Sequence, residues 1–165
     1  MNRNSFLKKS VLSGGILLTA PTILIGQKRD VISVEEISEF VGAAHNNFEK
    51  TKQIVEAKPL ILNCASQLAR GDFETAIGGA SHMGLRGIAD LLVSKGARLD
   101  IFNYTFLGYN DFVRKLITDY PNLLNAPGPH GFTLLHHAKA GGHSNMEEWL
   151  REKGLTETHF KGVFG

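Results

Sequence analysis

Residues 131–155 read GFTLLHHAKAGGHSNMEEWLREKGL, and this stretch decides the fold because its pattern occurs a second time upstream. Residues 74–97, ETAIGGASHMGLRGIADLLVSKGA, align with residues 132–155 without a gap. The matched pairs are Thr75 and Thr133, Ile77 and Leu135, Ala80 and Ala138, Gly84 and Gly142, Ile88 and Met146, Leu92 and Leu150, and Gly96 and Gly154. Self-similarity of this kind indicates a protein built from repeats.

Two weaker copies also occur, one before the first strong copy and one between the two strong copies. The segment GYNDFVRKLITDYPNLLNA begins at Gly108, and NNFEKTKQIVEAKPLILNC begins at Asn46. Their apolar pairs and their prolines, Pro59 and Pro121, fall at matching positions. The chain therefore contains four copies of one unit, with unevenly spaced turn residues. These turn residues are Asn46, Gly84, Gly108 and Gly142.

Each unit predicts a pair of helices. A threonine such as Thr75 can cap the first helix, whose small residues let neighbouring helices approach closely. A glycine then supplies the left-handed backbone conformation that ends the helix. A second helix follows with apolar residues at spacings of three and four, and it ends at a glycine or before a proline. One pair cannot bury its apolar stripe alone, so we expect an all-α solenoid of about four stacked units.

The unit resembles the ankyrin repeat, whose signature is T-P-L-H-x-A followed by a glycine and a second helix. In the fourth unit Gly131, Thr133, Leu135, His136, Ala138, Gly142 and His143 match, while Leu134 replaces the proline. The second unit keeps the threonine but has Ala76 for the proline and Gly78 for the histidine. The third unit lacks the threonine motif, and the first shows mainly its second helix. The chain also resembles bacterial ankyrin-repeat proteins with export signals, a likeness that carries over no established activity.

Ankyrin-type proteins carry protruding hairpins, called fingers, between successive repeats. Between Ala97 and the next first helix the chain has only Arg98, Leu99 and Asp100, and Asp100 is expected to cap that helix directly. One finger is therefore shortened, with a gap at the middle of the finger edge. Fingers are expected at residues 64–74 and 126–132.

The amino terminus has the pattern of an export signal. Arg3, Lys8 and Lys9 precede an uncharged, mostly apolar run that continues to Gln27. RNSFLKK also resembles the twin-arginine motif, with Asn4 in place of the second arginine. We expect residues 1–26 to be the export signal, 27–34 a linker, 35–155 the ankyrin-repeat domain and 156–165 a tail. The expected location is the periplasm or cell envelope, and an uncleaved membrane-anchored scaffold is the alternative.

Composition excludes several classes of protein. The net charge is only +2, and part of the basic excess lies at the amino terminus, so no basic face for nucleic acid is expected. The single cysteine, Cys64, cannot form an internal disulfide. Phosphate-loop, nucleophile-elbow and common zinc-ligand spacings are missing from the sequence. We therefore expect no cofactor, no metal ligand and no catalytic residue.

Four of the seven histidines fall within residues 130–143. His136 and His143 occupy ankyrin-consensus positions, and the resemblance implies that their rings bond to backbone groups and connect one repeat to the next. His82, His130 and His137 are not explained in this way. Their expected role is in a contact surface, and a metal or catalytic role is the alternative.

The resemblance implies that the concave face, built from fingers and first helices, binds another protein. Carried over position by position, this face consists of Phe73, His82, Met83, Asn103, Tyr104, Tyr109, His130, Phe132 and His137. The expected function is thus a non-catalytic module that binds an unidentified partner protein. The rival is an enzyme or metal-binding accessory protein that uses His82, His130 and His137. Convergence of these imidazoles beside a carboxylate such as Asp72 or Glu74 would favour this alternative.

Overall fold

A computed structural model describes residues 31–164. The chain divides into two units, Met1–Val31 and Ile32–Gly165, and everything below concerns the second. The predicted export signal, residues 1–26, lies outside the described residues. Within residues 31–164 no helix has the length and apolar character needed to cross a membrane.

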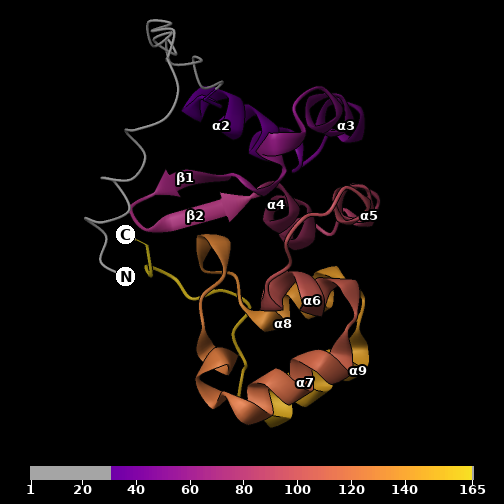
Figure 1. Ribbon diagram of the computed structural model, residues 1–165. Coiled ribbons are helices and arrows are strands. Elements are labelled where there is room, and N and C mark those ends of the chain that lie inside the picture. The colour runs from indigo at the N-terminus through magenta and orange to yellow at the C-terminus, as the bar shows by residue number, and fades with distance from the viewer. Residues whose placement is uncertain (1–30, 165) are drawn as a thin grey trace, which may run out of the picture. The chain divides into compact units, whose positions relative to one another are not determined.

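The described chain is mostly helical, as predicted, and forms four consecutive helix pairs (Figure 1). The pairs are α2 (Val34–Ala43) with α3 (Phe48–Ala57), α4 (Ala76–His82) with α5 (Arg86–Ser94), α6 (Ile101–Leu107) with α7 (Asn110–Asp119), and α8 (Leu134–Ala140) with α9 (Ser144–Glu152). The first helices pack in a row, α2 on α4, α4 on α6 and α6 on α8. Three short 3-10 helices complete the helical elements: η1 (Pro59–Asn63), η2 (Pro121–Asn125) and η3 (Pro129–Gly131).

The helix boundaries follow the capping residues seen in the sequence. The side chains of Thr75, Asp100 and Thr133 accept hydrogen bonds from backbone N–H groups in the first turns of α4, α6 and α8. Such caps satisfy donors that a helix leaves free. Gly84 and Gly142, which follow α4 and α8, have positive φ of 72°. This backbone conformation favours glycine, as the repeat pattern predicted.

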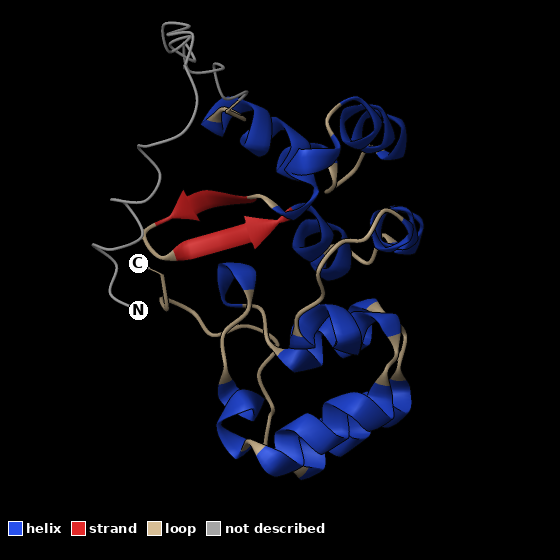
Figure 2. Cartoon of the chain, viewed as in Figure 1, coloured by secondary structure: helices blue, strands red, loops and turns tan. Residues whose placement is uncertain are grey.

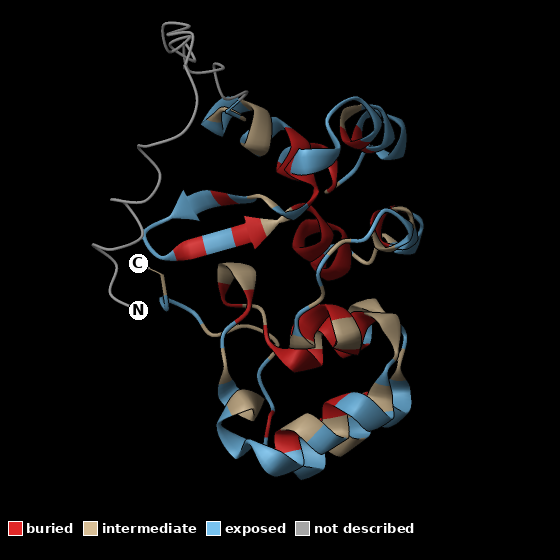
Figure 3. Cartoon of the chain, in the orientation of Figure 1, coloured by how far each residue is buried: buried red, intermediate tan, exposed pale blue. Residues whose placement is uncertain are grey.

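The core lies along the row of first helices. All seven residues of α4 are buried, and Figure 3 shows this helix surrounded by its neighbours. Its sequence, AIGGASH, is dominated by small side chains, which lets α2, α6 and α8 all approach it. Larger side chains from the second helices, such as Leu92 and Leu150, fill the remaining space.

The predicted finger at residues 64–74 is a two-stranded antiparallel hairpin, β1 (Ala65–Ala69) and β2 (Asp72–Thr75) (Figure 2). The segment 126–132 is different, because it contains the 3-10 turn η3 in place of a second hairpin. Between α5 and α6 the connection is short, and Asp100 caps α6 directly as expected. The η3 turn packs against β2.

Two histidines of the fourth helix pair bond to backbone carbonyls of other pairs; His143 reaches the adjacent third pair, as the ankyrin resemblance implied, whereas His136 reaches the second pair. The Nε2 atom of His143 lies 2.8 Å from the carbonyl oxygen of Phe106, and that of His136 lies 2.8 Å from the carbonyl oxygen of His82. Each imidazole therefore satisfies a carbonyl at the end of a first helix in another pair.

We expect Gly141→Ala to destabilise the fold. A Cβ atom at position 141 would lie 2.3 Å from the carbonyl oxygen of Phe106, in the contact that His143 also uses. The free energy of unfolding should fall by about 1–3 kcal/mol, the usual cost of overpacking. Urea denaturation measures it.

Gly87→Ala in α5 is the matched control, because a Cβ there meets nothing within 4 Å. This change should raise the free energy of unfolding by about 0.5–1 kcal/mol. Equal stability of the two variants would contradict the close packing at position 141.

Candidate metal centre

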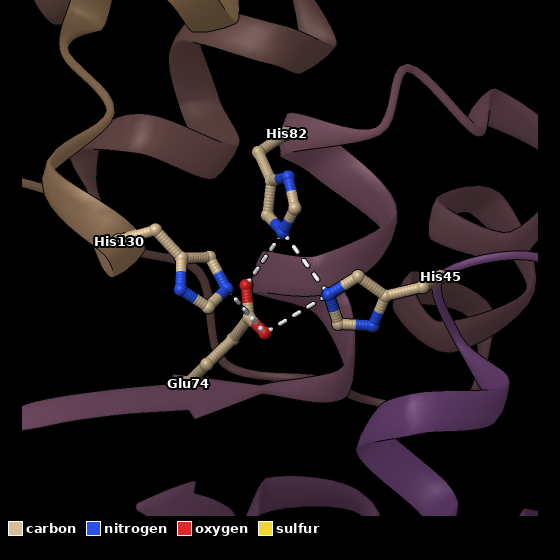
Figure 4. Close-up of side chains that lie close together, drawn as sticks. All are labelled: His45, Glu74, His82 and His130. Carbon is tan, nitrogen blue, oxygen red and sulfur yellow. Dashed lines mark hydrogen bonds and ion pairs between the residues drawn. The ribbon is translucent and has the colours of Figure 1, made fainter. Parts of the chain in front are cut away.

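Four side chains far apart in the sequence converge at one point (Figure 4). They are His45, just after α2, Glu74 on β2, His82, the last residue of α4, and His130 in η3. One nitrogen or oxygen atom from each lies within 4.8 Å of the others. The centre therefore joins the first, second and fourth helix pairs.

The shortest contacts link three of these residues. His82 Nε2 lies 2.9 Å from Glu74 Oε1, and His45 Nε2 lies 3.1 Å from Glu74 Oε2. The two Nε2 atoms lie 3.1 Å from each other, so the three groups form a closed triangle. His130 Nε2 is further away, 3.5 Å from Glu74 Oε2.

Glu74 is a charged group buried in the centre of the protein. Its side chain is fully inaccessible to solvent. Burial alone would raise its pKa, yet the neighbouring imidazoles of His45 and His82 outweigh burial and lower the pKa to about 2. The carboxylate is therefore ionised at any physiological pH. A buried negative charge needs positive charge beside it.

His45 is oriented by the helix that precedes it. Its Nδ1 atom lies 2.8 Å from the carbonyl oxygen of Val41 and donates its proton there. In the neutral ring the Nε2 lone pair therefore points at Glu74 and His82. The Glu74 carboxylate beside it raises the pKa of His45, since the protonated ring donates a hydrogen bond to that carboxylate. A proton or a metal cation must occupy the space between these atoms.

His130 is held by the other carboxylate of β2. Asp72 accepts a hydrogen bond from the backbone N–H of His130, 3.0 Å away, and lies 3.1 Å from His130 Nδ1. A carboxylate that holds one ring nitrogen fixes the tautomer and aims the other nitrogen, which is how metal-binding histidines are commonly supported. In this case the other nitrogen points at Glu74.

The hairpin places both carboxylates on one face of β2. Asp72 and Glu74 are two positions apart and buried, whereas Phe73 between them is exposed. This is the alternation that a strand imposes. On the helix side, Gly79 of α4 leaves space for His45, because a Cβ there would lie 2.6 Å from the imidazole.

The geometry fits a divalent transition metal. Metal–donor bonds of about 2.0–2.1 Å place two donors about 2.9 Å apart at a right angle and about 3.3 Å apart at a tetrahedral angle. The four short contacts here run from 2.9 to 3.5 Å, with His82 facing one oxygen of Glu74 and with His45 and His130 facing the other. Three imidazole nitrogens with one carboxylate suit Zn²⁺ or a related ion, whereas Ca²⁺ and Mg²⁺ prefer oxygen donors.

Comparison with models of known protein families gives no match, and comparison with curated protein sequences gives none either. The interpretation of the centre therefore depends on its own geometry.

The nine residues predicted to form a contact face are distributed over very different environments. Three are exposed: Phe73, Met83 and Tyr109. Three are half-buried: Tyr104, His130 and Phe132. Three are buried and so unavailable to a partner protein: His82, Asn103 and His137.

The buried three have identifiable internal partners. His82 contacts Glu74, and the Asn103 amide donates to the Ser81 hydroxyl over 3.1 Å. His137 donates from Nδ1 to the carbonyl oxygen of Thr133, 2.9 Å away, and packs against Phe102. Of the three histidines proposed for a metal or catalytic role, His82 and His130 converge beside a carboxylate, and His137 does not.

Sequence reasoning missed His45. Its helix belongs to the first repeat, where the threonine motif is not recognisable. The position of His45 in its repeat could have identified it. His45 follows the first helix of its pair, and His82 ends the first helix of the next pair, so stacked repeats bring the two together.

We expect the histidines of the metal-free protein to titrate over different pH ranges. Burial lowers the pKa of His137 to about 4, so this ring should stay neutral until the pH falls to about 4. His45 should keep its proton above its ordinary value of 6.5. An NMR titration of the histidine ring protons in EDTA measures both.

The same shifts determine how each group affects stability. His45 has a raised pKa, so its contribution is complete below pH 6.5 and is lost as the pH rises through the folded-state value. His137 has a lowered pKa, so its contribution is complete above pH 6.5 and is lost as the pH falls toward about 4. Coincident titration of the two rings would contradict the environments described here.

Proposed function

We propose that this protein is an ankyrin-type helical-repeat protein that binds a divalent transition-metal ion, with Zn²⁺ as the best match. The ligands are His45, Glu74, His82 and His130. The observation that carries the proposal is the convergence of three imidazole Nε2 atoms on a carboxylate that is fully buried.

The alternative is a metal-free network in which protonated histidines neutralise Glu74. One protonated imidazole would balance the single charge of Glu74, and a second charged ring beside it would be repelled. The centre instead directs three ring nitrogens to one point, two of them aimed by acceptors at Nδ1, namely Val41 and Asp72. The oxygens of Glu74 lie 2.9 Å from His82 Nε2 and 3.1 Å from His45 Nε2. A metal cation accounts for this arrangement more economically than added protons do.

The ankyrin type is supported by local features. These are the threonine caps on α4 and α8, the positive-φ glycines after them, and the imidazole of His143 that reaches the adjacent helix pair. Export to the periplasm or cell envelope stays part of the proposal on the strength of the basic and apolar pattern in residues 1–26.

Glu74→Gln should weaken Zn²⁺ binding by more than about 100-fold, since loss of a supporting partner alone costs 10–100-fold and Glu74 is a direct ligand. The amide has the same shape but no charge. Isothermal titration calorimetry of the full chain after EDTA treatment and dialysis measures the dissociation constant.

Glu39→Gln is the matched control, because Glu39 is exposed and pairs with Lys50 on the surface. It should bind Zn²⁺ like wild type. Circular dichroism tests whether the Glu74→Gln variant is folded. If it is not folded, His45→Gln provides a second test. The metal proposal fails if wild type binds no Zn²⁺, or if the folded Glu74→Gln variant binds it equally well.

Binding of another protein is the second proposal, and the exposure of Phe73 favours it. Phe73 is 58% exposed on the outer face of β2, although an aromatic side chain gains free energy on burial. Met83 and Tyr109 are more than half exposed as well.

Phe73→Ala should reduce capture of the partner in a pull-down from the envelope fraction, with the captured protein identified by mass spectrometry. Leu60→Ala is the control, because Leu60 is 84% exposed but lies on η1, outside the proposed face. Identical capture by both variants would count against this surface.

A further inference from the structure

The four ligands of the centre are not equivalent. His45, Glu74 and His82 form the tight triangle, whereas His130 makes the longest contact with the carboxylate. Their exposure follows the same order, since the His82 side chain is 5% exposed and that of His130 is 34% exposed. The His45 side chain is 23% exposed, so His130 is the most exposed of the three imidazoles.

His130 is also the ligand with the least favourable backbone. Its φ is 58°, and it is the one residue other than glycine with positive φ among residues 31–164. A residue with a side chain in this region is strained, and contacts from elsewhere must hold it there. The other three ligands lie in the turn after α2, on β2 and at the end of α4, and none of them has positive φ.

Part of that support comes from the carboxyl-terminal segment 157–160, which we call the C-terminal strap. The ring of His159 donates from Nε2 to the carbonyl oxygen of His130 over 2.7 Å. The backbone N–H of Phe160 donates to the carbonyl oxygen of Gly131, and Phe132 and His159 form an isolated β-bridge. The strap thus fixes the η3 turn immediately beside His130.

A cavity of about 230 Å³ lies between the hairpin and the strap. Its lining includes His130, Asp72, His159 and Phe160. Among the four ligands, His130 alone lines this cavity, so this is the space into which its imidazole would withdraw. Asp72 accepts from the backbone N–H of His130, and His159 donates to its backbone carbonyl, so both hold the backbone that positions the imidazole.

We propose that His130 is an exchangeable fourth ligand, and that a small monodentate anion takes its coordination position when it withdraws. This rests on the metal-binding function proposed above. The permanent ligands are then two imidazoles and one carboxylate, a donor set that binds transition metals while leaving positions open for an external ligand. His159 is a positioning residue that acts on the metal through the backbone of His130.

The experiment uses the full chain loaded with Co²⁺, whose visible absorption reports the number and kind of its ligands, and azide as the external anion. Wild type should bind Co²⁺ and respond to azide only at high concentration, because azide must displace His130. His130→Ala should still bind Co²⁺, and its affinity should fall by less than that of His82→Ala, because His130 makes the longest contact with the carboxylate. Its azide half-saturation should fall at least tenfold.

His159→Ala should give an azide half-saturation between those of wild type and His130→Ala, with the Co²⁺ affinity close to wild type. A purely structural role for His159 would leave the azide titration unchanged. Lys161→Ala, an exposed change just beyond the strap, should match wild type.

Two results would overturn the proposal while leaving metal binding intact. In one, azide leaves the spectrum of Co²⁺-loaded His130→Ala unchanged. In the other, His130→Ala loses Co²⁺ as completely as His82→Ala does, which would make His130 a permanent ligand. Failure of wild type to bind Co²⁺ at all is a different result, and it would overturn the metal function itself.

Discussion

The buried charge of Glu74 is the constraint on which the arrangement of this protein depends. An ionised carboxylate away from water is tolerated only when positive charge or strong donors surround it. Here the surrounding groups are imidazoles from three separate helix pairs, so the electrostatic requirement of one residue is met by the tertiary fold. The small residues of α4 serve the same end, because they let α2 and α8 come close enough for His45 and His130 to reach the carboxylate.

One strand serves two environments. Along β2 the side chains alternate, with Asp72 and Glu74 directed to the centre and Phe73 directed to solvent. The hairpin thus carries both the charged residues of the proposed metal site and an exposed aromatic side chain. The two proposed functions share the hairpin, so a change in its structure would affect both metal binding and protein binding.

Much of the fold was predictable from sequence because its signals are local. Thr75 and Thr133 mark helix starts, Gly84 and Gly142 mark turns, and His143 occupies a position from which the repeat pattern implies a bond to the backbone of the adjacent repeat. The centre was predictable only in part, since its ligands meet through long-range packing. His82, His130, Asp72 and Glu74 were named as candidates, but His137 was grouped with them and turns into the core. The path of the η3 turn depends on the left-handed backbone at His130. The sequence pattern did not predict this backbone conformation.

The spacing of the ligands along the chain has a thermodynamic consequence. With Cys64 as its single cysteine, the chain cannot form an internal disulfide. A metal ion held by residues from His45 to His130 would be a cross-link over most of the folded domain. A disulfide that closes a loop of comparable length restricts the unfolded chain by roughly 4–5 kcal/mol, and a coordinated ion restricts it in the same sense. The durability of the fold would then follow the supply of metal and not the redox state of the surroundings.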